Sequence, residues 1–223
     1  SWEHWLGTDA LGRDVLSRTL HGARYSLPIA VVVVTIAVAV GALLGAISGF
    51  VGGFVGAAIM RLVDVTLSFP PMLLAMAVAA SLGPGLENAT VAMVIVWWPV
   101  YARLMRAQVL EVREREHVEA AVAAGASRPR VLFKHILPLC WTPVLISATM
   151  DLGQVILLAA SLSFIGLGAT PPSPEWGSMI SDGAAQFYSW WVALGPGLAI
   201  LSIVLGFNFI GDGLHDYFDP RSK

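Results

Sequence analysis

Long stretches without Asp, Glu, Lys or Arg constrain the fold of this chain more than any other feature of its sequence. They hold 36 residues between Arg24 and Arg61, 22 between Asp64 and Glu87, 15 between Glu87 and Arg103, 23 between Asp151 and Glu175, and 29 between Asp182 and Asp212. A helix needs about 20 apolar residues to cross a bilayer. Charged residues make up 13% of the chain, against about 25% in a soluble domain. The sequence therefore predicts an integral membrane protein.

These stretches predict an all-α chain with five transmembrane helices, at about 26–50, 56–81, 89–108, 141–168 and 190–212. The runs lack the alternation of apolar and polar residues that membrane barrels show. The third run is short, so we expect Arg103 and Arg106 to lie near its end and to extend toward the interface. Pro70 and Pro71 are expected to break the second helix.

The distribution of Lys and Arg predicts the orientation of these helices. If the loop at 109–140 is cytoplasmic, alternation also places the 50–56 turn and the C-terminal tail inside. Ten basic residues are then inside: Arg61, Arg103, Arg106, Arg113, Arg115, Arg128, Arg130, Lys134, Arg221 and Lys223. Three are outside, namely Arg13, Arg18 and Arg24. The reverse orientation inverts this bias, and with five helices the two ends face opposite sides. A sixth helix before Ser1 would bring the true N-terminus inside.

Several residues within the predicted helices are candidates for packing or for a translocation path. Gly41, Gly45, Gly49 and Gly53 recur at four-residue spacing, which permits close helix contact within the chain, with another subunit or along a path. The charged and aromatic candidates are Arg61, Asp64, Asp151, Trp97 and Trp98. Arg61 and Asp64 are spaced for an ion pair at i,i+3. Asp151 is either a path residue or a hydrogen-bonded packing residue, and the two tryptophans either line a cavity or pack on a neighbour.

The loop before the last predicted helix is rich in Gly and Pro. It reads GLGATPPSPEWGSMISDGAAQFYSWW, from Gly166 to Trp191. Ser173 or Ser178 is expected to cap a short helix that ends near Ala185. This pattern indicates a re-entrant or surface element on the outer side.

Motifs for catalysis or for metal binding were sought and not found. The sequence holds no H-E-x-x-H, no G-x-S-x-G and no P-loop, so this chain cannot hydrolyse ATP by the P-loop route. Its five histidines do not share a metal-binding spacing, and its single cysteine excludes an internal disulfide. A net charge of -2 gives no argument for nucleic-acid binding. These observations predict no catalytic, cofactor or metal site in this chain.

The charged segment 113–138 contains EAAVAAGASRPRVLFKHILP, from Glu119 to Pro138. A helix over 114–124 with a bare, alanine-rich surface is expected to break at Gly125, a typical left-handed position. A second helix is expected to start after Ser127 and to end at Pro138. The small residues would let this bent segment insert into a groove of a soluble partner.

EAAVAAG followed by ILP resembles the EAA loop of permeases in ABC importers. Three further segments resemble the C-type permease subunits of the dipeptide/oligopeptide/nickel group. They are HWLGTDALGRDVLSRTLHGARYSL at 4–27, SLSFIGLGATPPSPEWGSMI at 161–180 and NFIGDGLHDYFDPR at 208–221. His135 stands where a hydrophobic residue is often found, and His215 where Arg is frequent. The resemblance extends from about residue 4 to residue 221.

This resemblance implies a type I ABC importer permease fold with six helices, the first of them upstream of Ser1. It divides the chain into a pre-core segment (1–24), a transmembrane domain (25–214) with the coupling loop at 113–138, and a cytoplasmic tail (215–223). It implies a second homologous permease subunit, two ATP-binding subunits that hold ATP and Mg²⁺, and an extracytoplasmic substrate-binding protein. Glu119, Ala120, Ala121 and Gly125 match the motif that docks into an ATPase.

The resemblance further implies ATP-driven import across a bacterial or archaeal cytoplasmic membrane, with no covalent chemistry in this chain. We expect di- or oligopeptides as cargo, because His is absent from the predicted helices and a metal path would favour clustered His or Met. A nickel or glutathione importer is the alternative within the family. Two alternatives lie outside the family. An intramembrane enzyme would show activity as the purified subunit, and a passive channel would conduct without ATPases.

Overall fold

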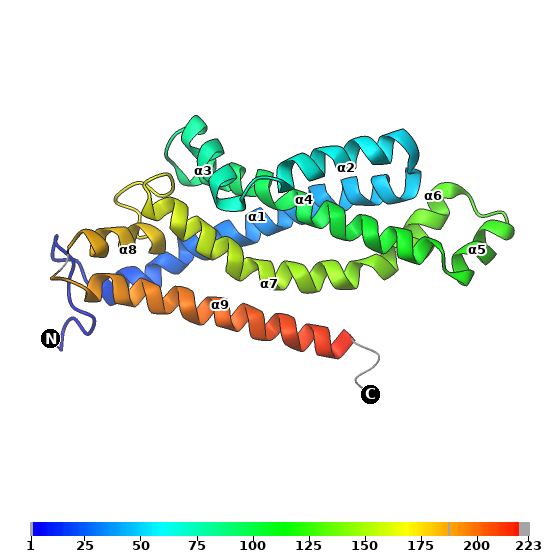
Figure 1. Ribbon diagram of the computed structural model, residues 1–223. Helices are drawn as coiled ribbons and strands as arrows, with labels where there is room; N and C mark the ends of the chain where they lie inside the picture. The colour runs from blue at the N-terminus through cyan, green and yellow to red at the C-terminus, as the bar shows by residue number, and fades with distance from the viewer. Residues whose placement is uncertain (1, 187, 219–223) are drawn as a thin grey trace.

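The computed structural model describes residues 2–186 and 188–218, which form an elongated helical bundle (Figure 1). Ser1, and residues 219–223 of the predicted tail with Arg221 and Lys223, lie outside the described residues. The helices are α1 (Val15–Val51), α2 (Gly53–Leu67), α3 (Pro71–Leu82), α4 (Leu86–Arg113), α5 (Glu116–Ala123), α6 (Arg128–Arg130), the π-helix η1 (Val131–Ile136), α7 (Leu137–Phe164), α8 (Trp176–Ala185) and α9 (Trp191–Phe218). The all-α prediction is confirmed.

Three helices are long and apolar enough to cross a membrane: α1, the continuous helix Arg128–Phe164, and α9. The pair α2 and α3 would make a fourth span if counted together, but the two helices meet at an angle of 91°. This break at Pro70 and Pro71 was predicted, whereas its sharpness was not. Helix α4 is long enough, with 28 residues, but its composition does not qualify. The predicted number of five spans is therefore not confirmed.

The helices also extend beyond the predicted bounds of the spans. Helix α1 begins at Val15, inside the segment that was predicted to precede the core, and α9 continues to Phe218. Asp14 caps α1, since its side chain accepts a 2.7 Å hydrogen bond from the Ser17 backbone N–H. Helical hydrogen bonding does not stop at a bilayer boundary, so runs of apolar residues underestimate helix length.

The two ends of the bundle carry different elements (Figure 1). The α1–α2 turn and α5 lie at one end, called here the α5 end. The N-terminal segment, α8 and the start of α9 lie at the other, called here the α8 end. This distribution follows the alternation that the sequence predicted for the loops.

Glycines bring α1 and α4 into close contact along much of their length. A Cβ atom on Gly41 would collide with the Trp98 carbonyl oxygen, and one on Gly45 with that of Ala102. Gly49 lies against Val109. Gly53 is not part of this contact, because it follows the break at Gly52 and faces open space. Of the readings left open for these glycines, the structure shows packing within the chain for the first three.

Helix α8 is fixed to α1 rather than lying free on the surface. Its N-cap is Glu175, not Ser173 or Ser178 as predicted, and the Glu175 carboxylate accepts a 2.9 Å bond from the Ser178 backbone N–H. The Ser26 hydroxyl of α1 donates to the same carboxylate at 3.3 Å, and the Trp176 indole donates to the Thr19 carbonyl at 2.8 Å. The longer glutamate reaches both partners while it is buried. The predicted end of this helix at Ala185 is confirmed.

The N-terminal segment packs on the start of α9. The Trp191 indole donates to the Thr8 carbonyl at 3.1 Å. Asp9 pairs with Arg13 at 2.7 Å. Burial raises the pKa of Asp9, but hydrogen bonds from Arg13 and from the Leu11 backbone outweigh it, so the pKa lies below its ordinary value. The segment is therefore an ordered part of the α8 end.

Candidate functional site

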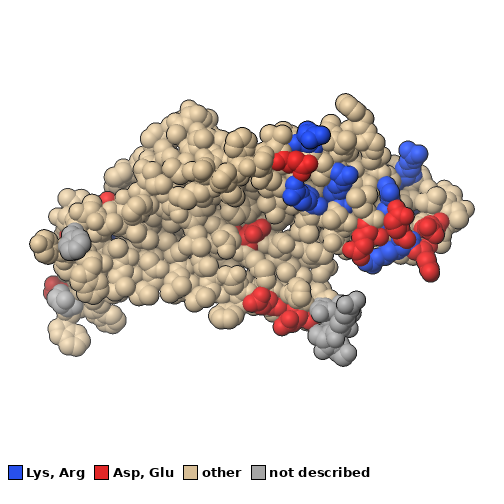
Figure 2. Space-filling view, viewed as in Figure 1, with Lys and Arg blue, Asp and Glu red and all other residues tan. Residues whose placement is uncertain are grey.

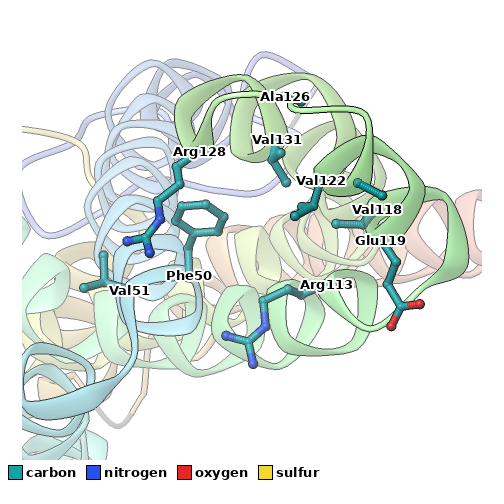
Figure 3. Close-up of a pocket in the computed structure, with 10 residues that line it drawn as sticks. Phe50, Val51, Arg113, Val118, Glu119, Val122, Ala126, Arg128 and Val131 are labelled. Carbon is teal, nitrogen blue, oxygen red and sulfur yellow. The ribbon is translucent and has the colours of Figure 1, made fainter.

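A groove of about 710 Å³ lies at the α5 end, between the end of α1 and the 113–138 loop. Figure 3 shows Phe50, Val122 and Val131 directed toward this groove, and the Glu119 carboxylate directed away from it. The full lining is Phe50, Val51, Arg113, Val118, Glu119, Val122, Ala123, Ala126, Arg128 and Val131. An apolar floor with basic groups at its edge suits contact with another protein chain.

The loop turns at Gly125 through a complete C-terminal helix cap. Gly125 has φ 81°, and its N–H donates to the Val122 carbonyl at 2.9 Å. The Ala126 N–H donates to the Ala121 carbonyl at 3.1 Å. These two bonds define a Schellman motif, which requires a left-handed residue at the position of Gly125. The predicted break is confirmed, and it closes α5 after eight residues.

Helix α5 is held by one buried side chain and exposes most of its others. Val118 is 2% exposed and belongs to the core, while Glu119 and Ala120 are exposed and Ala121 is half-buried. Glu119 lies in the first turn, where a carboxylate interacts favourably with the helix dipole. Of the four motif residues, three thus present a thin, partly acidic surface next to the groove, and Gly125 fixes the turn that follows.

The second arm of the loop differs from the prediction. Ser127 occupies the N-cap position without a side-chain capping bond. Pro138 does not end the helix, because η1 leads directly into α7, and Arg128–Phe164 forms one continuous helix. Proline lacks the N–H for an α-helical bond and its ring crowds the preceding turn. The wider π turn just before Pro138 accommodates both, so the loop is joined rigidly to the bundle.

The charged pair predicted within the second span has a different partner. Asp64 of α2 accepts a 2.6 Å bond from the guanidinium of Arg103 on α4, rather than from Arg61. The side chain of Arg61 is exposed. Helices α2 and α4 lie side by side, so Arg103 reaches Asp64 across the contact between them. Sequence spacing alone could not indicate this partner.

Asp151 is hydrogen-bonded within the bundle. The hydroxyl of Tyr101 on α4 donates to Asp151 Oδ2 on α7 at 2.7 Å, and the Trp97 side chain lies beside the same carboxyl group. Tyr101 is fully buried, and Asp151 is half-buried. Trp97 and Trp98 are half-buried and pack against the core. Three members of this region were predicted from sequence, whereas Tyr101 was missed. Its position four residues after Trp97, on one helical face, was the available signal.

The two polar contacts should differ in their effect on stability. We expect Asp64→Asn to lower the free energy of unfolding by less than about 1 kcal/mol, because both side chains of that pair are 56% exposed. Tyr101→Phe should cost about 1–3 kcal/mol, because it removes a buried bond to a charged group. Thermal unfolding of the detergent-solubilised protein measures both variants. Equal effects would contradict this ranking.

On the face that Figure 2 shows, charge is concentrated at the α5 end. Arg115 pairs with Glu111 at 2.7 Å, and Arg113 with Glu114 at 3.1 Å. The face shown along the rest of the bundle is nearly free of Lys and Arg (Figure 2). The groove and α5 therefore lie in the most polar part of a largely apolar surface.

The sequence also matches a known protein family. Residues 41–223 match the family of binding-protein-dependent transport system inner membrane components. The chain belongs to this family. The permease is 53% identical over 225 residues to the dipeptide transport system permease protein DppC of Escherichia coli, covering 100% of this chain and 75% of that protein. It is 49% identical over 224 residues to the glutathione transport system permease protein GsiD of Salmonella typhimurium, covering 100% of this chain and 74% of that protein.

Solved structures support the same fold. The permease superposes on a chain of the inward-facing MetNI methionine ABC transporter with a TM-score of 0.72 and 19% identity, over 88% of this chain and 94% of that one. A chain of an amino acid ABC transporter crystallised with histidines gives a TM-score of 0.69 and 15% identity, over 92% and 94%. The permease therefore has the fold of ABC importer permeases and is a membrane protein.

Proposed function

We propose that this chain is the membrane-spanning subunit of an ATP-driven importer of di- or oligopeptides in a bacterial cytoplasmic membrane. The observation that carries the proposal is the similarity to the Escherichia coli dipeptide permease, with 53% identity over the whole of this chain and 75% of that protein. The coupling segment supports it, because α5 and the adjoining groove form a prepared contact surface at one end of the bundle.

In this proposal, ATP is hydrolysed in two partner subunits and not in this chain. A second, homologous permease completes the bundle, and an extracytoplasmic binding protein delivers the cargo at the α8 end. The α5 surface around Glu119, Ala120 and Ala121 docks into an ATPase. The continuous helix Arg128–Phe164 then transmits motion of the docked segment into the spans.

Uptake in cells tests the cargo. A strain without this permease should fail to accumulate a radiolabelled dipeptide, and the wild-type chain should restore uptake. Unlabelled dipeptide should reduce uptake of the labelled dipeptide in cells with the same ATP level. Undiminished uptake in the deletion strain, or competition by nickel salts without competition by dipeptides, would reject the proposal.

Glutathione is a second candidate cargo, favoured by the 49% identity to a glutathione permease. It is itself a peptide with a free ammonium group, so the same route could accept it. Stronger competition by glutathione than by dipeptides in the same assay would favour this alternative.

The docking of α5 makes a separate prediction. Glu119→Lys should reduce co-purification of the ATPase subunits about tenfold, because it reverses the charge of an exposed residue at the proposed contact. Glu87→Lys is the matched control, since Glu87 is exposed in the first turn of α4 at the other end. Equal co-purification of both variants would show that Glu119 does not contact an ATPase.

A further inference from the structure

Two polar side chains of α7 lack the partners that polar groups in a membrane helix normally find. Ser147 is half-buried and Gln154 is exposed. Within residues 2–186 and 188–218, neither makes a side-chain hydrogen bond or ion pair. In contrast, Thr149 donates to the Leu145 carbonyl at 2.9 Å, and Ser161 to the Leu157 carbonyl at 2.8 Å. An unsatisfied amide against lipid costs several kcal/mol, so Gln154 requires water, a ligand or another chain.

Ser147, Asp151 and Gln154 share one face of α7. At 100° per residue, the three positions fall within about 60° of one another around the helix. We call them the polar face of α7. Leu145 lies about 160° away by the same measure, and it is 53% exposed. The helix therefore presents a polar face and an apolar face at the same depth.

The polar face leads into a hollow between α7 and α9. This cavity of about 570 Å³ is lined by Ser147 and by Thr142, Ile146 and Met150 of α7, with His215 and Phe218 of α9. Asp151 lies one turn further along α7, with its carboxylate oriented by the Tyr101 hydroxyl. Polar groups thus continue from the interior of the bundle to an open hollow.

We propose that the polar face of α7 lines the translocation path, and that Asp151 contacts the ammonium group of the peptide in transit. This inference rests on the proposed function. The Asp151 carboxylate, oriented by the Tyr101 hydroxyl at 2.7 Å, offers a negative charge that attracts an ammonium ion. The Gln154 amide and the Ser147 hydroxyl can exchange hydrogen bonds with the peptide groups or with water.

The reactivity of introduced cysteines tests whether water reaches the polar face of α7. The chain has one cysteine, Cys140, which is buried and donates to the Ile136 carbonyl at 3.3 Å, so Cys140→Ser provides the background. In the assembled transporter, Ser147→Cys and Gln154→Cys should react with a charged methanethiosulfonate about tenfold faster than Leu145→Cys, because thiolates form where water reaches. Dipeptide delivered by the binding protein should slow the reaction at residue 154.

Equal rates at the three positions would overturn the inference, as would labelling of residues 147 and 154 only after removal of the sister permease. The second result would place the polar face in the subunit contact. Dipeptide uptake by the wild-type assembly is measured in parallel. Because labelling does not depend on which cargo is carried, failure of the cargo assignment is distinguishable from failure of the path assignment.

A charge variant tests the role of Asp151 itself. Asp151→Asn keeps an acceptor for the Tyr101 hydroxyl but removes the charge, and should lower dipeptide uptake per assembled transporter about tenfold. Asp151→Glu should retain most uptake. Wild-type uptake by the Asn variant would show that Asp151 serves in packing and not in contact with cargo.

Discussion

Replacing Gly125 with Val is expected to abolish coupled transport while the permease still inserts into the membrane. Gly125 has φ 81°, and a non-glycine residue in this region costs about 1–2 kcal/mol, more when it is β-branched. That cost is comparable to the packing that holds α5, which buries one side chain, Val118. The Schellman cap should open and α5 should leave its position beside the groove. We expect uptake to fall at least about tenfold, because about 1.4 kcal/mol is a tenfold change in an equilibrium constant. Uptake and ATP hydrolysis are measured in the same proteoliposomes.

The space around Gly125 permits a clean control. A Cβ atom at this position meets no atom within 4 Å, so the effect of Val arises from backbone conformation and not from a clash. Gly125→Asn should therefore retain most transport, because Asn tolerates the left-handed region. Gly166 is another left-handed glycine with open space around its Cβ position, so Gly166→Val tests whether such strain at any position is enough to stop transport. Wild-type uptake by Gly125→Val would reject the role of the turn.

Gly45→Ala should strongly lower the stability of the bundle. A Cβ atom there would overlap the Ala102 carbonyl, and backbone cannot move aside as a flexible side chain can. Overpacking usually costs about 1–3 kcal/mol, and we expect the upper end of this range because α1 and α4 must separate. The abundance of the protein in membranes and its thermal unfolding in detergent should both decrease.

Gly206→Ala in α9 is the matched control for this substitution. Gly206 is also helical and has open space around its Cβ position. Alanine there should be neutral or slightly stabilising, since it lowers the conformational freedom of the unfolded chain. A similar loss in both variants would mean that glycine packing between α1 and α4 is not what stabilises the bundle.

The features that were predictable from sequence are local in origin. The left-handed break at Gly125 follows from backbone sterics, and the breaks at Pro70 and Gly52 follow from residue type. Long apolar runs indicated helices correctly because hydrophobicity is a sum over neighbouring residues. They did not set the number of spans, since α4 combines packing against α1 with charges at both of its ends.

The features that sequence missed depend on contacts between distant residues. The partner of Asp64 is Arg103, 39 positions away, and the partner of Asp151 is Tyr101, 50 positions away. Likewise, Glu175 became the cap of α8 because Ser26 lies beside it in space. Pro138 was misread because the π turn before it is visible only in the backbone. Spacing rules consider one helix at a time, whereas these hydrogen-bond partners are set by contacts between helices.

The π turn at Val131–Ile136 has a consequence for how such permeases can diverge. A π turn arises when one extra residue is inserted into an α-helix, so losing a residue here would restore regular α-helical bonding. Because the wider turn takes up the extra residue, the segments before and after it would keep nearly the same orientation. A single-codon deletion at this point would instead place Pro138 within a regular α-helix, where its ring crowds the preceding turn, and would kink the joint between the docking segment and α7.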